Sequence, residues 1–395
     1  MSELSYFEKL LDGVEVEWLP LGNVTKYEQP TKYLVKAKDY HDTFSIPVLT
    51  AGKTFILGYT DETHGIYEAS KTPVIIFDDF TTASKWVDFD FKAKSSAMKM
   101  ITSSDDIRFS LKYVYYWLNT LPSELVDGDH KRQWISNYAQ KKVPVPCPAN
   151  PEKSLAIQAE IVRILDKFTE LTAELTAELT LRKKQYNYYR DKLLSFEEGE
   201  VEWKALEEVS TFANGKGHEK DISEDGKYIV VNSKFISTDG EVAKLSNKQL
   251  CPLFKDDILL VMSDLPNGKA LSKTFIVDED HKYTLNQRIG GITVKNSNEL
   301  LPKFLHYFLN RTPQLLKHDN GVDQTNLRKG QILEVKIPII SLIKQVQIVE
   351  ALDKFDTYTK SISEGLPREI ELRQKQYEYY RDLLFSFPKP ETASN

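Results

Sequence analysis

Apolar residues recur at every third or fourth position through two long segments of the chain. From Ile157 to Leu175 the apolar positions step by 4, 3, 4, 3 and 4, which is the heptad spacing of a coiled-coil seam. The seam residues are Ile157, Ile161, Ile164, Phe168, Leu171 and Leu175, and the seam resumes at Tyr186, Tyr189, Leu193 and Phe196. We therefore expect one helix on the order of 60 Å long, at roughly 1.5 Å per residue.

The run TAELTAEL, residues 172–179, interrupts this heptad pattern. The step from Leu175 to Leu179 is four residues where the heptad requires three, because one four-residue unit is written twice. An inserted step of this kind is a stutter, which unwinds a supercoil locally.

A second segment, residues 341–395, repeats the pattern with an interruption. Its seam residues are Ile348, Leu352, Phe355, Ile362 and Leu366, followed by Ile370, Tyr377, Tyr380, Leu384 and Phe387. Gly365 and Pro367 lie between the two parts, so we expect a kink or short break near Gly365, with Pro367 in the first turn of the helix that follows.

The two helical segments are copies of one another. KQYNYYRDKLLSF (184–196) and KQYEYYRDLLFSF (375–387) share ten of thirteen residues, at an offset of 191 because 375 minus 184 is 191. Upstream, IVRILDKF (161–168) matches IVEALDKF (348–355) at an offset of 187. Such a helix cannot bury its stripe alone, and two copies imply a pseudo-twofold relation, so we expect antiparallel pairing.

Several residues that lie mostly off the apolar stripe are also identical in the two copies. Packing of the seam does not account for them, and aromatic and arginine side chains are the anchors that protein interfaces favour. We expect these residues to bind two copies of one partner; the alternative is a solvated face that has diverged slowly. They are Gln185, Tyr188, Arg190 and Asp191, and Gln376, Tyr379, Arg381 and Asp382.

The rest of the chain has short β-branched and aromatic runs between Gly, Asn and Asp turns, as in TPVIIFDDF and DDILLVMSD. This pattern favours two α/β (α+β) domains. Their ends resemble each other, as VEWLPLGNV and VEWKALEEV do, and their middles do not. We expect a first variable region at 1–150, a helical region at 151–198, a second variable region at 199–340, and a helical region with a tail at 341–395.

Loop-like stretches of both variable regions carry basic, hydroxyl and amide side chains. Lys and Arg can bind phosphates, while Arg, Asn and Gln can read base edges, although a single cluster is more often a solvated loop. The candidates in the first region are Lys53, Thr81, Thr82, Lys85, Lys92, Lys94, His130, Lys131, Arg132 and Gln133. Those in the second are Lys216, Lys220, Asn232, Lys234, Asn267, Lys269, Gln287, Arg288, Gln324, Asn326 and Arg328.

The composition is that of an ordinary globular protein, and 395 residues with 41% hydrophobic content predict two or more domains. No run of eighteen apolar residues offers a membrane span, and the first residues carry acids where a signal peptide needs a positive leader, so we expect a cytoplasmic protein. The net charge of −6 argues against a free-standing nucleic-acid binder. Any DNA binding would therefore depend on local clusters of basic and amide side chains and not on the charge of the whole chain.

Motifs for catalysis are missing from the sequence. The two cysteines, Cys147 and Cys251, have no neighbours at zinc-ligand spacing. The pairs Gly215-Lys216 and Gly268-Lys269 lack the other residues of a P-loop, and neither the Gly-rich loop nor the Asn/Asp-Pro-Pro-aromatic motif of adenine methyltransferases occurs.

Two alternative functions remain open. Asp78 and Asp79, followed by Asp90 and Lys92, have a loose likeness to the Asp…Asp-x-Lys arrangement of a metal-dependent nuclease, in which carboxylates hold Mg²⁺. Asp264 with Asp280-His281-Lys282 has a similar spacing. The other alternative is a coiled-coil scaffold that never touches DNA.

The alternation of variable regions with the helices LRKKQYNYYRDKLLSF (181–196) and LRQKQYEYYRDLLFSF (372–387) closely resembles the specificity subunit of type I restriction-modification enzymes. The resemblance covers the whole chain. The TAEL units are similar to those of the type IC branch, in which they vary in copy number within the central spacer.

This resemblance implies a noncatalytic subunit in which each variable region is a target recognition domain that reads one half of a split, asymmetric DNA target. It implies that the paired helices set the half-site spacing and dock two methyltransferase subunits, which methylate adenine. Restriction translocase subunits would join that complex. S-adenosylmethionine, Mg²⁺ and ATP are expected on the partner subunits, with no cofactor on this chain.

Overall fold

The computed structural model describes residues 10–11, 13–36, 40–52, 54–122, 132–197, 199–266, 268–360 and 365–388. The chain forms two compact units. The first unit comprises residues 1–177 and 368–395, and the second comprises residues 178–367. Each unit therefore contains one variable region and parts of both helical segments.

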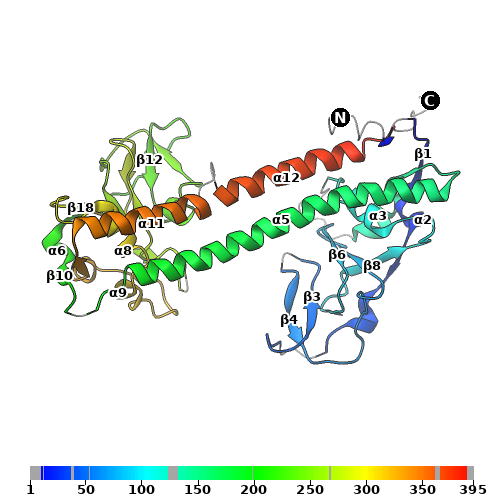
Figure 1. Ribbon diagram of the computed structural model, residues 1–395, viewed down its shortest axis with the longest axis horizontal. Helices are drawn as coiled ribbons and strands as arrows, with labels where there is room; N and C mark the ends of the chain where they lie inside the picture. Colours follow the sequence, from blue (N-terminus) through cyan, green and yellow to red (C-terminus); the bar gives the residue numbers. More distant parts are fainter. Residues whose placement is uncertain are drawn as a thin grey trace. The chain divides into compact units, whose positions relative to one another are not determined.

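Three long helices follow the two heptad segments (Figure 1). They are α5 (Pro151–Leu193), α11 (Leu342–Lys360) and α12 (Gly365–Leu384). The first part of α5 packs in the first unit with α12, and the last part of α5 packs in the second unit with α11. The sustained heptad spacing predicts these helices, because a continuous apolar stripe is buried only against a second helix.

The helices pair through equivalent contacts in the two units. The Phe168 ring stacks on Tyr380 with 5.3 Å between ring centroids, and the Tyr189 ring stacks on Phe355 at 5.7 Å. Phe168 corresponds to Phe355 in the internal repeat, and Tyr380 corresponds to Tyr189. Each stacked pair therefore joins the upstream part of one copy to the downstream part of the other.

The direction of pairing is clear in the second unit. Tyr189 lies on Phe355, while the Arg182 guanidinium lies over the Tyr358 ring at 5.8 Å. The residue numbers fall along α5 as they rise along α11, so the helices are antiparallel. The expected antiparallel pairing is confirmed.

The break in the second helical segment also lies where the sequence predicts a kink or break. Helix α11 ends at Lys360 and α12 begins at Gly365, with Pro367 in its first turn. Gly365 has a φ of +77°, and a Cβ atom there would lie 2.6 Å from the Thr357 carbonyl oxygen, so only glycine fits without strain. The seam residue Ile362 lies outside the described residues.

The described residues of the first variable region form short strands and small helices. Its strands are β1 (Val16–Pro20), β2 (Thr25–Glu28), β3 (Ile46–Leu49), β4 (Ile56–Thr60), β5 (Val74–Asp78), β6 (Ser84–Val87), β7 (Lys92–Ala93), β8 (Met98–Ser103) and β9 (Lys142–Pro146). Its α-helices are α2 (Leu21–Val24), α3 (Leu111–Leu118) and α4 (Gln133–Ser136), and its 3-10 turns are η1 (Pro30–Tyr33) and η2 (Tyr138–Gln140).

The second variable region has a similar order of elements. Its strands are β10 (Glu202–Ala205), β11 (Ser210–Asn214), β12 (Tyr228–Val231), β13 (Lys244–Ser246), β14 (Ile258–Val261), β15 (Ser263–Asp264), β16 (Thr274–Ile276), β17 (Tyr283–Leu285), β18 (Ile289–Val294), β19 (Thr325–Asn326) and β20 (Lys336–Ile339). Its helices are α6 (Leu206–Val209), α7 (Ser233–Ser237), α8 (Pro302–Leu309), α9 (Pro313–Leu316) and α10 (Lys329–Leu333).

The sheets of the two variable regions have the same topology. The four-stranded sheet β2-β8-β5-β6 corresponds to β11-β18-β14-β16, the three-stranded sheet β4-β3-β7 to β13-β12-β17, and the pair β1-β9 to β10-β20. The pair β15-β19 is found in the second region. The expected α+β scaffold, present in two copies with different loops, is confirmed.

The core of each variable region continues into its long helices. In the first unit, buried residues of β5 and α3 pack with Ile161 and Leu165 of α5 and with Leu384 at the end of α12. In the second unit, β14 and α8 pack with Ile348 and Leu352 of α11. Each variable region is therefore anchored to the helices by apolar burial.

No helix among the described residues is both long enough and apolar enough to cross a membrane.

Candidate docking and DNA-binding surfaces

A buried glutamine joins each variable region to its helix. In the first unit, Gln158 Oε1 accepts the Ser110 N–H at 2.8 Å, and its Nε2 donates to the Arg108 carbonyl at 3.0 Å. Gln345 is 0% exposed in the second unit and makes the same two bonds, to Leu301 N–H and the Glu299 carbonyl, both at 2.8 Å. These contacts hold the N-terminal ends of the equivalent helices α3 and α8 against α5 and α11.

A carboxylate eight residues after each glutamine, about two helical turns further along, completes each junction. Asp166 accepts hydrogen bonds from the Tyr116 hydroxyl and from Lys112 Nζ, the latter at 2.9 Å. Asp353 does the same with Tyr307 at 2.6 Å and Lys303 at 2.8 Å. Burial raises the pKa of Tyr116, and the adjacent carboxylate raises it further, so the phenol stays a neutral donor.

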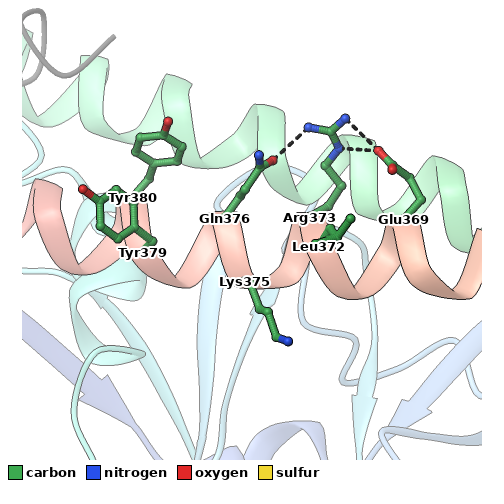
Figure 2. A pocket seen from close by; sticks show the side chains of 7 residues that line it. All are labelled: Glu369, Leu372, Arg373, Lys375, Gln376, Tyr379 and Tyr380. Carbon is green, nitrogen blue, oxygen red and sulfur yellow. Dashed lines mark hydrogen bonds and ion pairs between the residues drawn. The ribbon is translucent and has the colours of Figure 1, made fainter. Parts of the chain in front are cut away.

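Seven residues on α12 line a shallow groove of about 340 Å³ in the first unit (Figure 2). They are Glu369, Leu372, Arg373, Lys375, Gln376, Tyr379 and Tyr380. At the repeat offset, α5 carries the same seven residue types in the second unit, namely Glu178, Leu181, Arg182, Lys184, Gln185, Tyr188 and Tyr189. We call each set of seven a repeated surface.

The polar side chains of the repeated surface are held in the same way in both units. Arg373 donates to Glu369 Oε1 and to Gln376 Oε1, each at 2.8 Å, as Figure 2 shows. Arg182 likewise donates to Glu178 Oε1 at 3.3 Å and to Gln185 Oε1 at 3.0 Å. A guanidinium held at both ends presents a fixed shape to a partner.

A tyrosine and a leucine of each repeated surface are exposed. Tyr188 is 62% exposed and Tyr379 is 56% exposed, and the leucines Leu181 and Leu372 are 54% and 39% exposed. Large apolar side chains that are exposed together and framed by charged residues mark a protein interaction surface.

The four predicted partner-binding positions of each copy divide into two groups. Gln185 and Tyr188 belong to the repeated surface, whereas the guanidinium of Arg190 lies over the Tyr186 ring at 5.9 Å and ion pairs with Asp191 at 2.7 Å. The same holds for the second copy, in which Arg381 ion pairs with Asp382, lies over Tyr377 and donates to the Asn119 carbonyl. The arginine side chains, 20% and 18% exposed, support the aspartates, which are 68% and 63% exposed.

Three further residues of each repeated surface were not predicted as partner-binding from the sequence: Glu178, Leu181 and Arg182, and their copies Glu369, Leu372 and Arg373. The signal was present, because the residue identity at the offset of 191 extends upstream to these positions. Only the structure shows that they share one face with Tyr188 and Tyr379.

Lys92, which the sequence predicts to be a DNA-binding residue, is buried inside the first unit. Lys92 is 2% exposed, donates to the His64 carbonyl and ion pairs with Glu62 at 3.1 Å. Its ammonium group therefore holds the β4–β5 loop inside the domain and is not positioned to meet a phosphate. Lys53, His130, Lys131 and Asn267 lie outside the described residues.

Other candidates of the first region come together around the β5–β6 turn. Asp79 accepts the Trp134 N–H at 2.8 Å, and its carbonyl accepts the Gln133 N–H at 2.8 Å, which ties Arg132 and Gln133 to this turn. Thr81 and Thr82 lie in the same turn. Lys85 and Lys94 are exposed on other segments.

The geometry of the carboxylates argues against the nuclease alternative. Asp79 is buried in an ion pair with Lys99 at 3.3 Å, Asp78 accepts the Phe80 N–H in its turn, and Asp90 accepts hydrogen bonds from Ser70. Among the described residues, no group of three or more His, Cys, Asp or Glu side chains is placed to hold a metal ion. These carboxylates stabilise turns and the core.

In the second region, the structure brings distant candidates together in two groups. A β-bridge between Lys216 and Asn286 places Lys216 beside Gln287 and Arg288, and Gln287 Nε2 donates to Glu219, the residue before Lys220. Asn232 lines a pocket with Asn286. Lys234 follows Asn232 in α7. The second group lies around the strand pair β15-β19, where Gln324 donates to Ser263 Oγ; its exposed members are Lys269, Gln324, Asn326 and Arg328.

Comparison with known proteins identifies the family to which this chain belongs. The family model described as the type I restriction modification DNA specificity domain matches residues 198–372. The type I restriction enzyme EcoR124I/EcoR124II specificity subunit of Escherichia coli is 61% identical, and the alignment covers 100% of both chains. This chain belongs to the type I specificity-subunit family.

Two further likenesses agree with this family. The EcoprrI specificity subunit of Escherichia coli is 31% identical, and the alignment covers 92% of this chain and 93% of that relative. The crystal structure of a type I restriction-modification S subunit from M. genitalium shares the fold with a TM-score of 0.58 at 17% identity, covering 96% of this chain and 98% of that one.

A specificity subunit of this family is noncatalytic. It gives a type I restriction-modification complex its DNA sequence specificity, and it works with DNA, methyltransferase subunits and restriction subunits.

Proposed function

We propose that the two variable regions act as target recognition domains for different halves of a split DNA target, while the two repeated surfaces each dock one methyltransferase subunit. One observation carries this proposal. The same seven residue types, with the same arginine-centred hydrogen bonds, occur in both units, whereas the loops of the variable regions differ. Identical surfaces suit identical partners, and different loops suit different half-sites.

The remaining exposed candidates supply the DNA contacts in this proposal. Lysine and arginine side chains bind phosphates, and the amide side chains read base edges. Because the chain carries a net charge of −6, the partner subunits supply much of the sequence-independent attraction to DNA. S-adenosylmethionine, Mg²⁺ and ATP belong to those subunits, and the complex works in the cytoplasm.

The number of methyltransferase subunits bound by variant chains tests the docking part of the proposal. Native mass spectrometry of the natural chain mixed with excess methyltransferase is expected to show two bound subunits. Two double variants each alter one repeated surface and should therefore each bind one subunit. The first carries Leu181→Ala with Tyr188→Ala, and the second carries Leu372→Ala with Tyr379→Ala. The chain with all four substitutions should bind none at the same concentrations.

Glu174→Ala is the matched control, because Glu174 is exposed on α5 but lies outside the repeated surface. This variant is expected to keep both subunits. Retention of two subunits by the fourfold variant would exclude the repeated surfaces as docking sites.

A further inference from the structure

We propose that a pocket at the carboxyl ends of β12 and β17 reads one A·T base pair of the half-site bound by the second unit, through the side chains of Asn232 and Asn286. The inference rests on the proposed function and assigns part of it to two named residues. The pocket has a volume of about 280 Å³ and is lined by His218, Glu219, Ile222, Val230, Asn232, Lys244 and Asn286.

The backbone places the two asparagines side by side. Strands β12 and β17 are parallel neighbours, with Val231 opposite Leu285 at their last residues. The next residue of each strand is an asparagine, and the Asn286 N–H donates to the Val231 carbonyl at 3.3 Å. Two amide side chains therefore meet at one edge of the sheet.

The hydrogen bonds already made by these side chains give them different roles. Asn232 Oδ1 accepts the Phe235 N–H at 2.9 Å, which fixes the orientation of this amide and leaves its NH2 group as a donor. Asn286 Oδ1 is buried and has no hydrogen-bond partner among the described residues. A buried amide oxygen is unfavourable until a donor reaches it. The pocket thus offers one donor beside one unsatisfied acceptor.

This pair of groups complements adenine in the major groove. Adenine presents the N7 acceptor beside the N6 amino donor, so the Asn232 NH2 group can donate to N7 while Asn286 Oδ1 accepts from N6. Guanine presents two acceptors, N7 and O6, and would leave the Asn286 oxygen facing O6. Ile222, which is 41% exposed, provides an apolar contact of the kind that suits the thymine methyl group.

Hydrogen bonds and a close backbone approach hold the wall of the pocket that contains His218 in place. His218 is 1% exposed and its ring nitrogens lie 2.8 Å from the Lys216 carbonyl and 2.9 Å from Thr284 Oγ1. A Cβ atom at Gly215 would lie 1.9 Å from the Asn286 carbonyl oxygen, so this close approach requires glycine. The loop that carries the exposed Lys216 is therefore fixed against the segment that carries Asn286.

Exposed cations surround the pocket and are placed to bind the phosphates beside the base pair. Lys216 and Lys220 precede and follow His218, Lys244 lines the pocket, and Arg288 follows Asn286 by two residues. Contacts of this kind position a protein on DNA without reading its sequence.

Two substitutions test the proposal in the full chain assembled with its methyltransferase subunits. Asn232→Asp keeps an oxygen for the Phe235 N–H and replaces the donor with an acceptor, and Asn286→Ala removes the acceptor. Initial methylation rates are measured on duplex oligonucleotides in which each position of the second half-site is varied through all four base pairs. Both variants should lose about 10-fold discrimination at one A·T position and keep it elsewhere.

Lys216→Ala is the contrasting control, because a phosphate contact acts on all sequences alike. It should weaken binding uniformly and leave every base preference unchanged. A thermal melt of each variant checks folding. If Asn286→Ala has a lowered melting temperature, the proposal is tested by Asn232→Asp alone, because this variant keeps the N-cap of α7.

Unchanged discrimination at every position in Asn232→Asp would overturn this pocket assignment while leaving the proposed function intact. A natural complex without any base preference in the second half-site would instead overturn the proposed function itself.

Discussion

At the scale of single residues, the junctions between helix and variable region depend on groups that the sequence does not reveal. Gln158 sits among apolar seam residues, and its two backbone partners, Ser110 and Arg108, lie 48 and 50 residues away. No local pattern predicts such contacts. The exposed Tyr188 and Tyr379 could be predicted, because their identity at the repeat offset is not explained by core packing.

Replacement of Gln158 by leucine is expected to destabilise the first unit. The side chain is 1% exposed, and leucine would leave the partly buried Ser110 N–H and Arg108 carbonyl without the hydrogen bonds that Gln158 makes to them. We expect the free energy of unfolding to fall by about 2–4 kcal/mol, as measured by urea denaturation. The exposed Gln374→Ala, which loses one surface bond to Glu378, should cost less than about 0.5 kcal/mol. Equal costs for the two variants would refute the junction role.

The partly buried phenol of Tyr377 predicts a loss of stability in alkali. Burial raises the pKa of Tyr377 to about 12 from the ordinary value of 10.0, with Arg381 opposing the rise. Its contribution is therefore complete below pH 10 and is lost as the pH rises through about 12. Tyr377→Phe should reduce the fall in the urea midpoint over that range.

Tyr379→Phe controls for removal of a hydroxyl from the exposed side of the same helix. The contribution of Tyr377 would be refuted if Tyr377→Phe lost as much stability between pH 10 and 12 as the natural chain does.

At the scale of elements, the helices could be predicted and the sheets could not. A heptad pattern sustained over many turns defines α5, α11 and α12, and Gly365 with Pro367 predicts the break between the last two. The strand order is set by distant partners, as in the pairing of β2 with β8 or the parallel pairing of β12 with β17. Alternating short runs indicate that strands exist, but they do not indicate which strands pair.

Double-mutant cycles can test whether the upstream part of each helical copy packs against the downstream part of the other copy. Phe168 stacks on Tyr380 in the first unit, although the counterpart of Tyr380 in the sequence copy that contains Phe168 is Tyr189. We expect a coupling energy of about 0.5–1.5 kcal/mol between Phe168→Ala and Tyr380→Ala in urea denaturation. Phe168→Ala and Tyr189→Ala should be additive. Coupling between Phe168 and Tyr189, with none between Phe168 and Tyr380, would contradict the observed packing of one helical copy against the other.

At the scale of the whole molecule, both compact units draw on both sequence copies. Along α5 the boundary between the two units falls between Ala177 and Glu178, within the TAELTAEL run. The division into shared helices and different loops could be predicted from the repeat. The grouping of Lys216, Asn232 and Arg288 could not, because these residues are far apart in sequence and meet only through the sheet β13-β12-β17.

Insertion of a third TAEL tetrad is expected to change the spacing of the DNA target. Four residues add about 6 Å of helix at roughly 1.5 Å per residue, which approaches two base pairs at roughly 3.4 Å each. We expect the unread gap between half-sites to lengthen by about one or two base pairs, with both half-sites unchanged, as mapped by methylome sequencing. An unaltered gap would contradict a spacing role for α5.

Exchange of one variable region, followed by mapping of the methylated sites, distinguishes a DNA-reading subunit from a scaffold. Residues 13–150 are replaced by the corresponding region of another specificity subunit, which keeps the junction with α5 at Pro151. If each region reads its own half-site, the methylated sequence changes in one half, while the other half and the gap stay the same. An unchanged target, or a change in both halves at once, would contradict the division of DNA reading between the two regions.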